Sequence, residues 1–180
     1  MARLDRRTDT RMERGCAVES SERHGDELTM ATVVLTGFMG TGKTRIGQEL
    51  ARRLGRPFID TDELIERAEG RPTSEVFAKR GEPYFRNVER KAVVQAVASS
   101  DAVIATGGGA IGDPEILACL QAAGPIVCLT ASPEVILART PAGSAGDIRP
   151  LLKGGSPRQR IAELLAARAP AYAGAELTVD

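Results

Sequence analysis

An eight-residue glycine-rich segment, residues 37–44, constrains this chain more than any other feature. It reads Gly-Phe-Met-Gly-Thr-Gly-Lys-Thr and fits the pattern G-x-x-x-x-G-K-[ST] in full. An apolar run typical of a strand precedes it, and a helical pattern follows it. Glycines let the backbone turn so that its N–H groups point at phosphate oxygens, and the N-terminus of the following helix adds partial positive charge. The segment therefore predicts a nucleoside triphosphate site in a chain that alternates strands and helices.

The side chains of this phosphate loop have distinct expected tasks. Lys43 adds a full positive charge that can follow the β- and γ-phosphates, and Thr44 offers a hydroxyl to Mg²⁺. The backbone of Gly40, Thr41 and Gly42 is expected to hold phosphate oxygens of ATP. The loop alone does not separate kinases from GTPases and motor ATPases.

The strand candidate at residues 102–106 helps with that distinction. GTPases and motor ATPases usually hold Mg²⁺ with an acidic residue that ends a later strand. Here the run ends instead in Gly107-Gly108-Gly109, and the chain has no N/T-K-x-D motif of the kind that reads guanine. These two observations favour a kinase that acts on a small molecule.

Alternating strand and helix patterns run from residue 31 to the end of the chain. Strands are expected at residues 32–36, 57–60, 102–106, 125–130 and 176–179. Helices are expected at residues 43–54, 62–68, 74–80, 83–98, 114–123, 133–140 and 157–169. In the first helix Ile46, Leu50 and Leu54 recur every four residues, and Gly55 follows as a C-terminal stop. Near-continuous apolar strands alternating with helices predict a parallel sheet covered on both faces.

Length, charge and the N-terminal segment limit the classes of protein to consider. A chain of 180 residues suits one domain, expected over 31–180, and a net charge of zero argues against a general nucleic-acid binder. No apolar stretch approaches the roughly 20 residues of a membrane span. Residues 1–30 are polar, with no secretory h-region, so we expect a disordered extension or a start codon assigned too early. We expect a cytoplasmic monomer.

Two aspartates follow the second strand candidate, in the sequence Phe-Ile-Asp-Thr-Asp. Asp60 and Asp62 are two residues apart, so in an extended chain they point the same way. One carboxylate could help to hold Mg²⁺, and the other could orient or deprotonate a hydroxyl group. The alternative is a helix cap, because Asp60 and Glu63 have the spacing of a capping box before Leu64.

Arginines and glycines further along the chain are candidates for binding an anionic acceptor. Arg86 could hold a carboxylate through its guanidinium fork, although a surface salt bridge with Glu89 is the alternative. Gly107–Gly109 could bring bare backbone close to substrate, or form a plain turn. Residues 141–155 are rich in Gly and Pro and carry Arg149, which suggests either a lid over the phosphates or a mobile surface loop. Arg139 closes a helix before that segment, and Arg168 lies near the end of a later one.

The order and spacing of these pieces resemble the shikimate kinase family over residues 31–180. The pieces are GFMGTGKT at 37–44, FIDTD at 58–62, GEPYFRNVE at 81–89, ATGGGA at 105–110, ART at 138–140, RPLL at 149–152 and RAPAY at 168–172. The resemblance implies a P-loop kinase fold, a three-layer α/β/α arrangement with a five-stranded parallel sheet in the order 2-3-1-4-5. It also implies a substrate-binding helical region at 61–98 and a lid at 141–155. The implied reaction is ATP- and Mg²⁺-dependent phosphorylation of the 3-hydroxyl of shikimate, a step of chorismate and aromatic amino-acid biosynthesis.

Matching positions imply a role for each candidate residue. On the nucleotide side, Thr44 and Asp60 would serve Mg²⁺, Lys43 and Arg149 would neutralise the transferring group, and Arg139 would lie against the adenine. On the acceptor side, Asp62 would hold the substrate hydroxyls and take the proton, while Arg86 and Arg168 would clamp the carboxylate. Gly108, between Gly107 and Gly109, would touch both substrate and phosphate.

Two features depart from the family pattern, and two other functions compete with it. Arg45 follows Thr44 where a small hydroxyl residue is common, so its contact with the α-phosphate of ATP is expected to differ. The chain ends at Asp180, before the adenine-contacting loop and closing helix usual in the family, so we expect either a truncated chain or one with lower nucleotide affinity and stability. The competing functions are another small-metabolite kinase, such as gluconate kinase, and a non-catalytic nucleotide-binding module. Retention of the whole set of Lys43, Asp62, Arg86, Arg149 and Arg168 favours catalysis.

Overall fold

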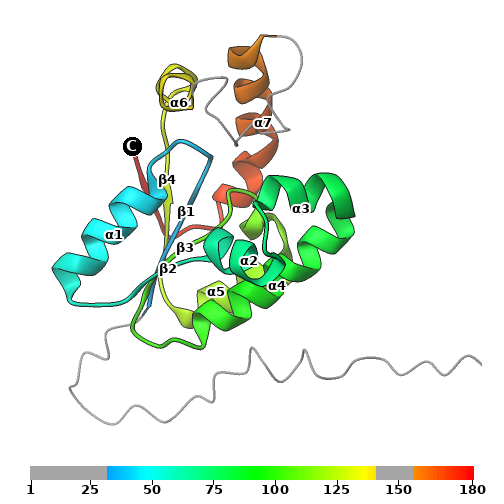
Figure 1. Cartoon of the computed structure of the whole chain (residues 1–180). Coiled ribbons are helices and arrows are strands. Elements are labelled where there is room, and N and C mark those ends of the chain that lie inside the picture. Colours follow the sequence, from blue (N-terminus) through cyan, green and yellow to red (C-terminus); the bar gives the residue numbers. More distant parts are fainter. Residues whose placement is uncertain (1–31, 141–155) are drawn as a thin grey trace, which may run out of the picture.

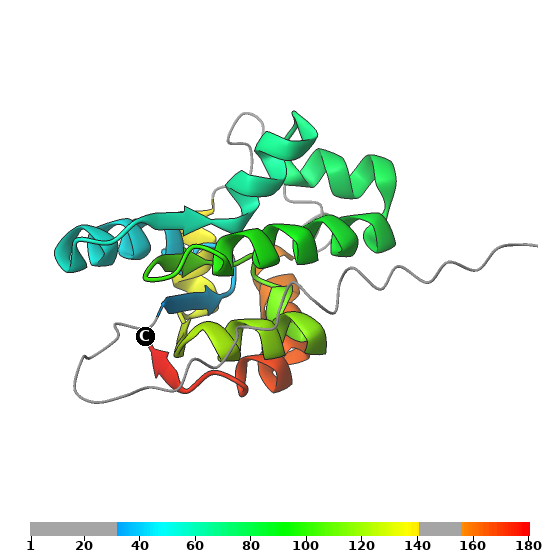
Figure 2. The same cartoon turned by 90° about the horizontal axis from the view of Figure 1, so that it is seen from below.

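A parallel sheet of five strands forms the centre of the computed structural model (Figure 1). The structure describes residues 32–140 and 156–180, so the expectations for the N-terminal extension, the lid and Arg149 lie outside the described residues. The strands are β1 (Val33–Gly37), β2 (Phe58–Asp60), β3 (Val103–Ala105), β4 (Ile126–Leu129) and β5 (Leu177–Val179). Their order is β2-β3-β1-β4-β5 and every pairing is parallel, which confirms the predicted sheet. β5 lies at one edge, where the chain ends (Figure 2).

Helices cover both faces of this sheet, as the alternating pattern predicted. The helices are α1 (Lys43–Leu54), α2 (Thr61–Glu69), α3 (Thr73–Arg80), α4 (Glu82–Val97), the 3₁₀ turn η1 (Ala110–Gly112), α5 (Pro114–Ala123), α6 (Pro133–Arg139) and α7 (Pro157–Tyr172). In Figure 1, α1 lies on one side of the sheet, α4 and α5 lie on the other, and α6 and α7 stand above the ends of the strands. None of the helices within residues 32–140 and 156–180 is both long and apolar enough to cross a membrane.

Alternate residues of the central strands supply two separate parts of the core. Val34 of β1 and Ile126 of β4 are fully buried and pack with Leu120 of α5. Their neighbour Leu35 points to the opposite face and packs with Ala51 of α1. Side chains alternate between faces along a strand, so a strand buried on both sides is apolar throughout. This burial explains why the strands appear in the sequence as continuous apolar runs.

Helix α1 has the predicted bounds but a different buried face. Ile46 is 45% exposed and Leu54 is 38% exposed, whereas Gly47 and Ala51 are buried against the sheet. A side chain at Gly47 would collide with the ring of Phe58. The helix therefore packs through small residues, because Phe58 fills the space that a larger residue on α1 would need.

The end of α7 differs most from the prediction. The sequence predicts a helix that ends at Ala169, directly before Pro170, and proline lacks an N–H group and usually disrupts helices. The helix instead continues through Pro170 to Tyr172. Proline here costs one hydrogen bond in the last turn, to the carbonyl of Ala166, which is an exposed residue that water can reach. As a result Tyr172 lies one helical turn beyond Arg168, on the same side of α7.

Candidate active site

Three segments that the sequence marked as functional meet at one edge of the sheet. The phosphate loop follows β1, Asp60 and Asp62 lie at the junction of β2 and α2, and Gly107–Gly109 follow β3. Strands β2, β3 and β1 are neighbours and run parallel, so their carboxyl ends lie side by side. Open parallel sheets bind their ligands at this edge. We call Gly107–Gly109 the glycine triplet.

The phosphate loop has a conformation that depends on its glycines. Gly40 has φ 78° and Gly42 has φ 98°, values that side chains strongly disfavour. Gly42 is the N-cap of α1, so the loop leads directly into the first turn of that helix. Thr41 is buried, and its hydroxyl donates to the carbonyl of Phe38 at 2.8 Å, which holds the turn closed. Several backbone N–H groups and the positive end of α1 thus gather in one place, as a site for phosphate requires.

Two cations lie against the carbonyl groups of this loop. Lys43 Nζ donates to the carbonyl oxygens of Gly37 at 2.9 Å and Phe38 at 3.1 Å, so its ammonium group lies within the curve of the loop. Arg139, at the end of α6, donates to the carbonyl oxygens of Gly40 and Thr41, both at 3.4 Å. Arg45 is exposed on the first turn of α1. All three residues therefore lie on the side of the site expected to hold the nucleotide.

Asp60 uses its two carboxylate oxygens for two different tasks. Oδ1 accepts a hydrogen bond from the N–H of Asp62 at 3.0 Å and caps α2. Oδ2 accepts from the hydroxyl of Thr44 at 3.0 Å. The cap that competed with the metal interpretation is therefore present, and it leaves the second oxygen beside Thr44. Mg²⁺ prefers oxygen ligands at 2.0–2.1 Å in octahedral geometry, where neighbouring ligands lie about 2.9 Å apart. A hydroxyl and a carboxylate at 3.0 Å fit that requirement.

Asp62 lies deeper in the site than Asp60. Burial raises the pKa of Asp62 from 3.8 to about 6, and the negative charges of Asp60, Glu89 and Glu66 add to the shift, while Lys43 opposes it. The carboxyl group of Asp62 is therefore harder to ionise than that of an exposed aspartate. An acid with a pKa near neutrality can accept a proton during a reaction and release it afterwards.

Side-chain and backbone atoms of the site approach the glycine triplet at distances that leave little or no room for a Cβ atom at Gly107 and Gly108. A Cβ atom at Gly107 would lie 2.9 Å from Glu89 Oε1 and 3.1 Å from Asp62 Oδ1. One at Gly108 would lie 3.0 Å from the carbonyl oxygen of Gly37 and 3.3 Å from Arg168 Nη1. None of the three glycines has a positive φ, so Gly107 and Gly108 are needed for close approach and not for an unusual backbone conformation. These close approaches favour a role in the site over a plain turn.

Arg86 and Arg168 approach the same end of the triplet from different helices. A Cβ atom at Gly109 would lie 3.4 Å from Arg86 Nη2 and 3.8 Å from Arg168 Nη2. Two guanidinium groups that approach one point form a site for an anion, and planar carboxylates match their hydrogen-bonding geometry. The arrangement joins α4 and α7, which are distant in the sequence.

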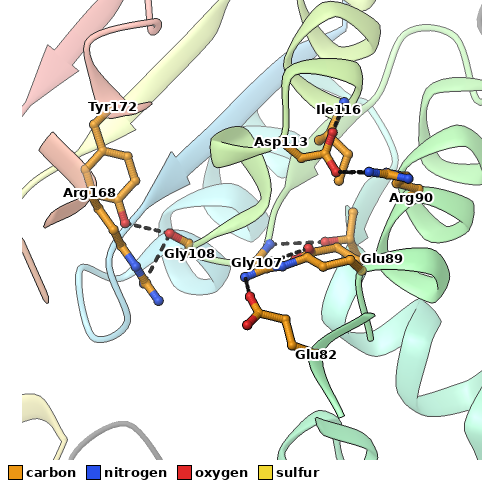
Figure 3. Close-up of polar contacts among 11 residues, drawn as sticks. Glu82, Glu89, Arg90, Gly107, Gly108, Asp113, Ile116, Arg168 and Tyr172 are labelled. Atoms are coloured by element: carbon orange, nitrogen blue, oxygen red, sulfur yellow. Dashed lines mark hydrogen bonds and ion pairs between the residues drawn. The ribbon is translucent and has the colours of Figure 1, made fainter. Parts of the chain in front are cut away.

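Glu89 holds Arg86 in place from within the protein. Its Oε2 accepts from Arg86 Nη1 at 2.6 Å, and the Glu89 side chain is only 2% exposed. Glu82, near the start of α4, accepts from Arg86 Nη2 at 3.3 Å (Figure 3). Burial raises the pKa of Glu89, and Arg86 counteracts part of that shift. The predicted pairing of Arg86 with Glu89 exists, but it is a buried support and not a surface salt bridge.

Arg168 is fixed by an aromatic ring and by the glycine triplet. Its guanidinium carbon lies 5.1 Å from the centre of the Phe38 ring, within the phosphate loop. Its Nη1 donates to the carbonyl oxygen of Gly108 at 3.2 Å (Figure 3). Phe38 therefore links the phosphate loop to the anion site, a role that the pattern G-x-x-x-x-G-K-[ST] does not reveal.

Four supporting residues were not recognised as part of the site from the sequence. The sequence predicts only a surface salt bridge for Glu89 and assigns no role to Phe38. Thr61 is fully buried, and its hydroxyl accepts from the N–H of Gly107 at 3.2 Å. The hydroxyl of Tyr172 donates to the carbonyl oxygen of Gly108. Thr61 lies within the motif FIDTD and Tyr172 within the motif RAPAY, so their membership of these motifs is the sequence signal that could have identified them.

The fold and the phosphate loop together define a P-loop kinase. The sequence model of the shikimate kinase family matches residues 39–180. The chain belongs to the shikimate kinase family.

Curated relatives and a solved structure agree with this assignment. The chain is 46% identical over 151 residues to a shikimate kinase of Caldanaerobacter subterraneus subsp. tengcongensis, covering 84% of this chain and 86% of the relative. It is 48% identical over 148 residues to a shikimate kinase of Thermus thermophilus, covering 82% and 79% of the two chains. Shikimate kinase from Acinetobacter baumannii in complex with shikimate superimposes with a TM-score of 0.78 at 37% identity, covering 84% of each chain. The expected family and fold class are both confirmed.

Proposed function

We propose that this protein transfers the γ-phosphoryl group of ATP to the 3-hydroxyl of shikimate, giving shikimate 3-phosphate and ADP. The observation that carries this proposal is the convergence of Arg86, Arg168 and Asp62 around the glycine triplet, beside the phosphate loop. Shikimate carries one carboxylate and several hydroxyl groups. Two guanidinium groups suit the carboxylate, and an aspartate suits a hydroxyl.

Each residue has a role that follows from its place in the site. The phosphate loop and Lys43 hold the β- and γ-phosphates of ATP and balance the charge that develops as the phosphoryl group moves. Arg86 and Arg168 fix the acceptor by its carboxylate. Phosphoryl transfer depends chiefly on positioning and charge, so this orientation of the acceptor supplies much of the catalysis.

Asp62 completes the reaction on the acceptor side. It accepts a hydrogen bond from the 3-hydroxyl and takes its proton as the oxygen attacks the γ-phosphorus and the bond to ADP breaks. Its raised pKa supports this role, because a carboxylate with a pKa of about 6 is a stronger base than an exposed aspartate. Glu89 keeps Arg86 directed at the acceptor.

The remaining assignments concern Mg²⁺, the adenine and the lid. Thr44 and Asp60 would hold Mg²⁺, and bound Mg²⁺ neutralises negative charge on the phosphate oxygens. Arg139 lies beside the phosphate loop, which supports a contact with the nucleotide. We assign to Arg149 the closing of the lid at 141–155 over the transferring group. We propose a monomer as the active unit.

An ADP-release assay with ATP, Mg²⁺ and alternative acceptors tests the proposal. Shikimate, gluconate, quinate and a blank without acceptor would be compared at equal concentrations. We expect turnover well above the blank with shikimate alone. Release of ADP that does not depend on shikimate would contradict the proposal, and turnover with gluconate would assign the site to another metabolite kinase.

A further inference from the structure

We propose that Tyr172 is a positioning residue for the acceptor, because it fixes the carbonyl of Gly108 and, through that carbonyl, the guanidinium of Arg168. The inference rests on the proposed function, since it assigns Tyr172 a part in holding the acceptor carboxylate. Tyr172 is one of two tyrosines in the chain and lies at the last position of α7.

The carbonyl oxygen of Gly108 accepts hydrogen bonds from two side chains of α7. The hydroxyl of Tyr172 donates to the carbonyl oxygen of Gly108 at 2.7 Å, and Arg168 Nη1 donates to the same oxygen at 3.2 Å. Figure 3 shows both side chains directed at Gly108 from α7. A carbonyl oxygen has two lone pairs, so these two donors use its full capacity. Because Arg168 uses one N–H group here, its other donors have a fixed direction.

Tyr172 is itself held firmly. Its ring packs against a buried cluster that includes Ala110 and Ile111 of η1, directly after the glycine triplet. Burial raises the pKa of its hydroxyl, with Arg168 opposing the shift, so the hydroxyl remains a neutral donor at physiological pH. The donor to Gly108 is therefore anchored independently of any bound substrate.

The position of Gly108 links this hydrogen bond to the chemistry. Gly108 lies between Arg168 and the phosphate loop, since a Cβ atom there would lie 3.0 Å from the carbonyl oxygen of Gly37 and 3.6 Å from the N atom of Met39. Movement of Gly108 would change the distance between the acceptor arginine and the phosphates. Thr61 restrains the other end of the same segment through the N–H of Gly107. The triplet is thus held from both sides by buried or half-buried hydroxyl groups.

Tyr172→Phe tests the proposal, with Tyr84→Phe as a matched control. Phenylalanine preserves the packing of the ring and removes only the hydroxyl. Tyr84 donates to Glu69 Oε1 at 2.9 Å, so its replacement removes a hydrogen bond of similar length that does not involve the glycine triplet or either acceptor arginine. We expect Tyr172→Phe to raise the KM for shikimate about five- to tenfold and to leave the KM for ATP within about twofold. Tyr84→Phe should leave both constants within about twofold.

A second measurement does not depend on the identity of the acceptor. Amide hydrogen exchange in the free protein should become faster in peptides that cover Gly107–Gly109 in Tyr172→Phe, and not in Tyr84→Phe. A purely structural role of Tyr172 would lower Tm and leave the KM for shikimate unchanged, which would overturn the proposal. Unchanged exchange at the triplet would overturn it as well. If the wild-type protein did not phosphorylate shikimate, the proposed function would fail, while the exchange comparison would still decide whether Tyr172 anchors the triplet.

Discussion

The phosphate loop and the acceptor side of the site lie at the same edge of the sheet but are built in different ways. The loop is formed by consecutive residues, and its conformation depends on glycines with positive φ and on the start of α1. The acceptor side uses side chains from α2, α4 and α7, which meet at the glycine triplet. Phosphate binding is therefore a local property of the sequence, whereas recognition of the acceptor is a property of the packed fold.

The two regions share two connections. Phe38 belongs to the loop and lies under Arg168, while Asp60 contacts Thr44 with one oxygen and caps the helix of Asp62 with the other. Because the two regions are otherwise built separately, variants of one region should alter phosphoryl transfer and variants of the other should alter acceptor binding. Phe38 and Asp60 are the exceptions, since a change at either residue would affect both regions.

The largest effect is expected for Asp62→Asn. Loss of the proton acceptor should lower kcat by about 10²–10⁴-fold, while the asparagine retains the shape of the side chain. In the metal-free protein without nucleotide, the same variant should be more stable than wild type above pH 6. A pKa of about 6 in the folded state, against 3.8 for the unperturbed group, means that the unfolded chain ionises first, so wild-type stability falls as pH rises between these values.

The size of this stabilisation is limited by the shift. It should approach about 3 kcal/mol at most well above pH 6 and disappear below about pH 3, where Asp62 is largely protonated in both states. Chemical denaturation of both proteins from about pH 3 to about pH 8 in EDTA measures it. A stability difference that does not change with pH would mean that the charge of Asp62 is not costly in the folded protein.

Lys43→Ala tests the phosphate side by itself. We expect kcat to fall by about 10²–10³-fold, because the variant lacks the positive charge that Lys43 places beside the transferring phosphoryl group. Binding of shikimate to the free protein should remain within about threefold of wild type, as measured by calorimetry. A large loss of shikimate affinity would show that the two regions are not separable in the way described.

The sequence predicts the phosphate loop more completely than it predicts the acceptor side of the site. The loop, the parallel sheet and most helix bounds could be predicted, because they depend on contiguous patterns and on the alternation of strands and helices. The order of the strands depended on the family resemblance. The assignments of Asp62, Arg86 and Arg168 depended on the family resemblance, since a single arginine on a helix is more often a solvent-exposed residue. Their convergence around the glycine triplet is a result of tertiary packing.

The features that were missed share a physical reason. Glu89 looks like any helical partner of Arg86 in the sequence, and only burial distinguishes it. Pro170 suggested that α7 ends early, although a proline in the last turn removes a single hydrogen bond. That error separated Tyr172 from the helix and hid its alignment with Arg168. In α1 the spacing of Ile46, Leu50 and Leu54 indicated the helix but not the buried face, which is set by the ring of Phe58.

Arg168→Lys should impair the acceptor side and largely spare the phosphate side, which is the reverse of the pattern expected for Lys43→Ala. Lysine retains the charge but loses the planar fork and the contact with the Phe38 ring. We expect the KM for shikimate to rise about 10–100-fold, with a smaller change in the KM for ATP. If both constants rose equally, Arg168 would act through the phosphate loop and not through the acceptor.

A smaller effect is expected for Gly109→Ala. The added methyl group would lie 3.4 Å from Arg86 Nη2 and 3.8 Å from Arg168 Nη2, in ordinary van der Waals contact, so it would occupy space beside both guanidinium groups where the acceptor carboxylate is expected. The KM for shikimate should rise about two- to fivefold. Gly112→Ala is the matched control, because a Cβ atom there meets no atom within 4 Å. Equal effects of the two variants would argue against a specific role of the triplet.

The most direct test of the acceptor site is the KM for shikimate of Arg86→Ala at saturating ATP. Arg86 is held by the buried Glu89 and lies beside Gly109, so its guanidinium is positioned to bind the acceptor carboxylate. The proposed role predicts a rise in this KM of at least about tenfold, because a charged hydrogen-bonding partner of the carboxylate is lost. An unchanged KM for shikimate would contradict the assignment of the carboxylate site to Arg86 and Arg168.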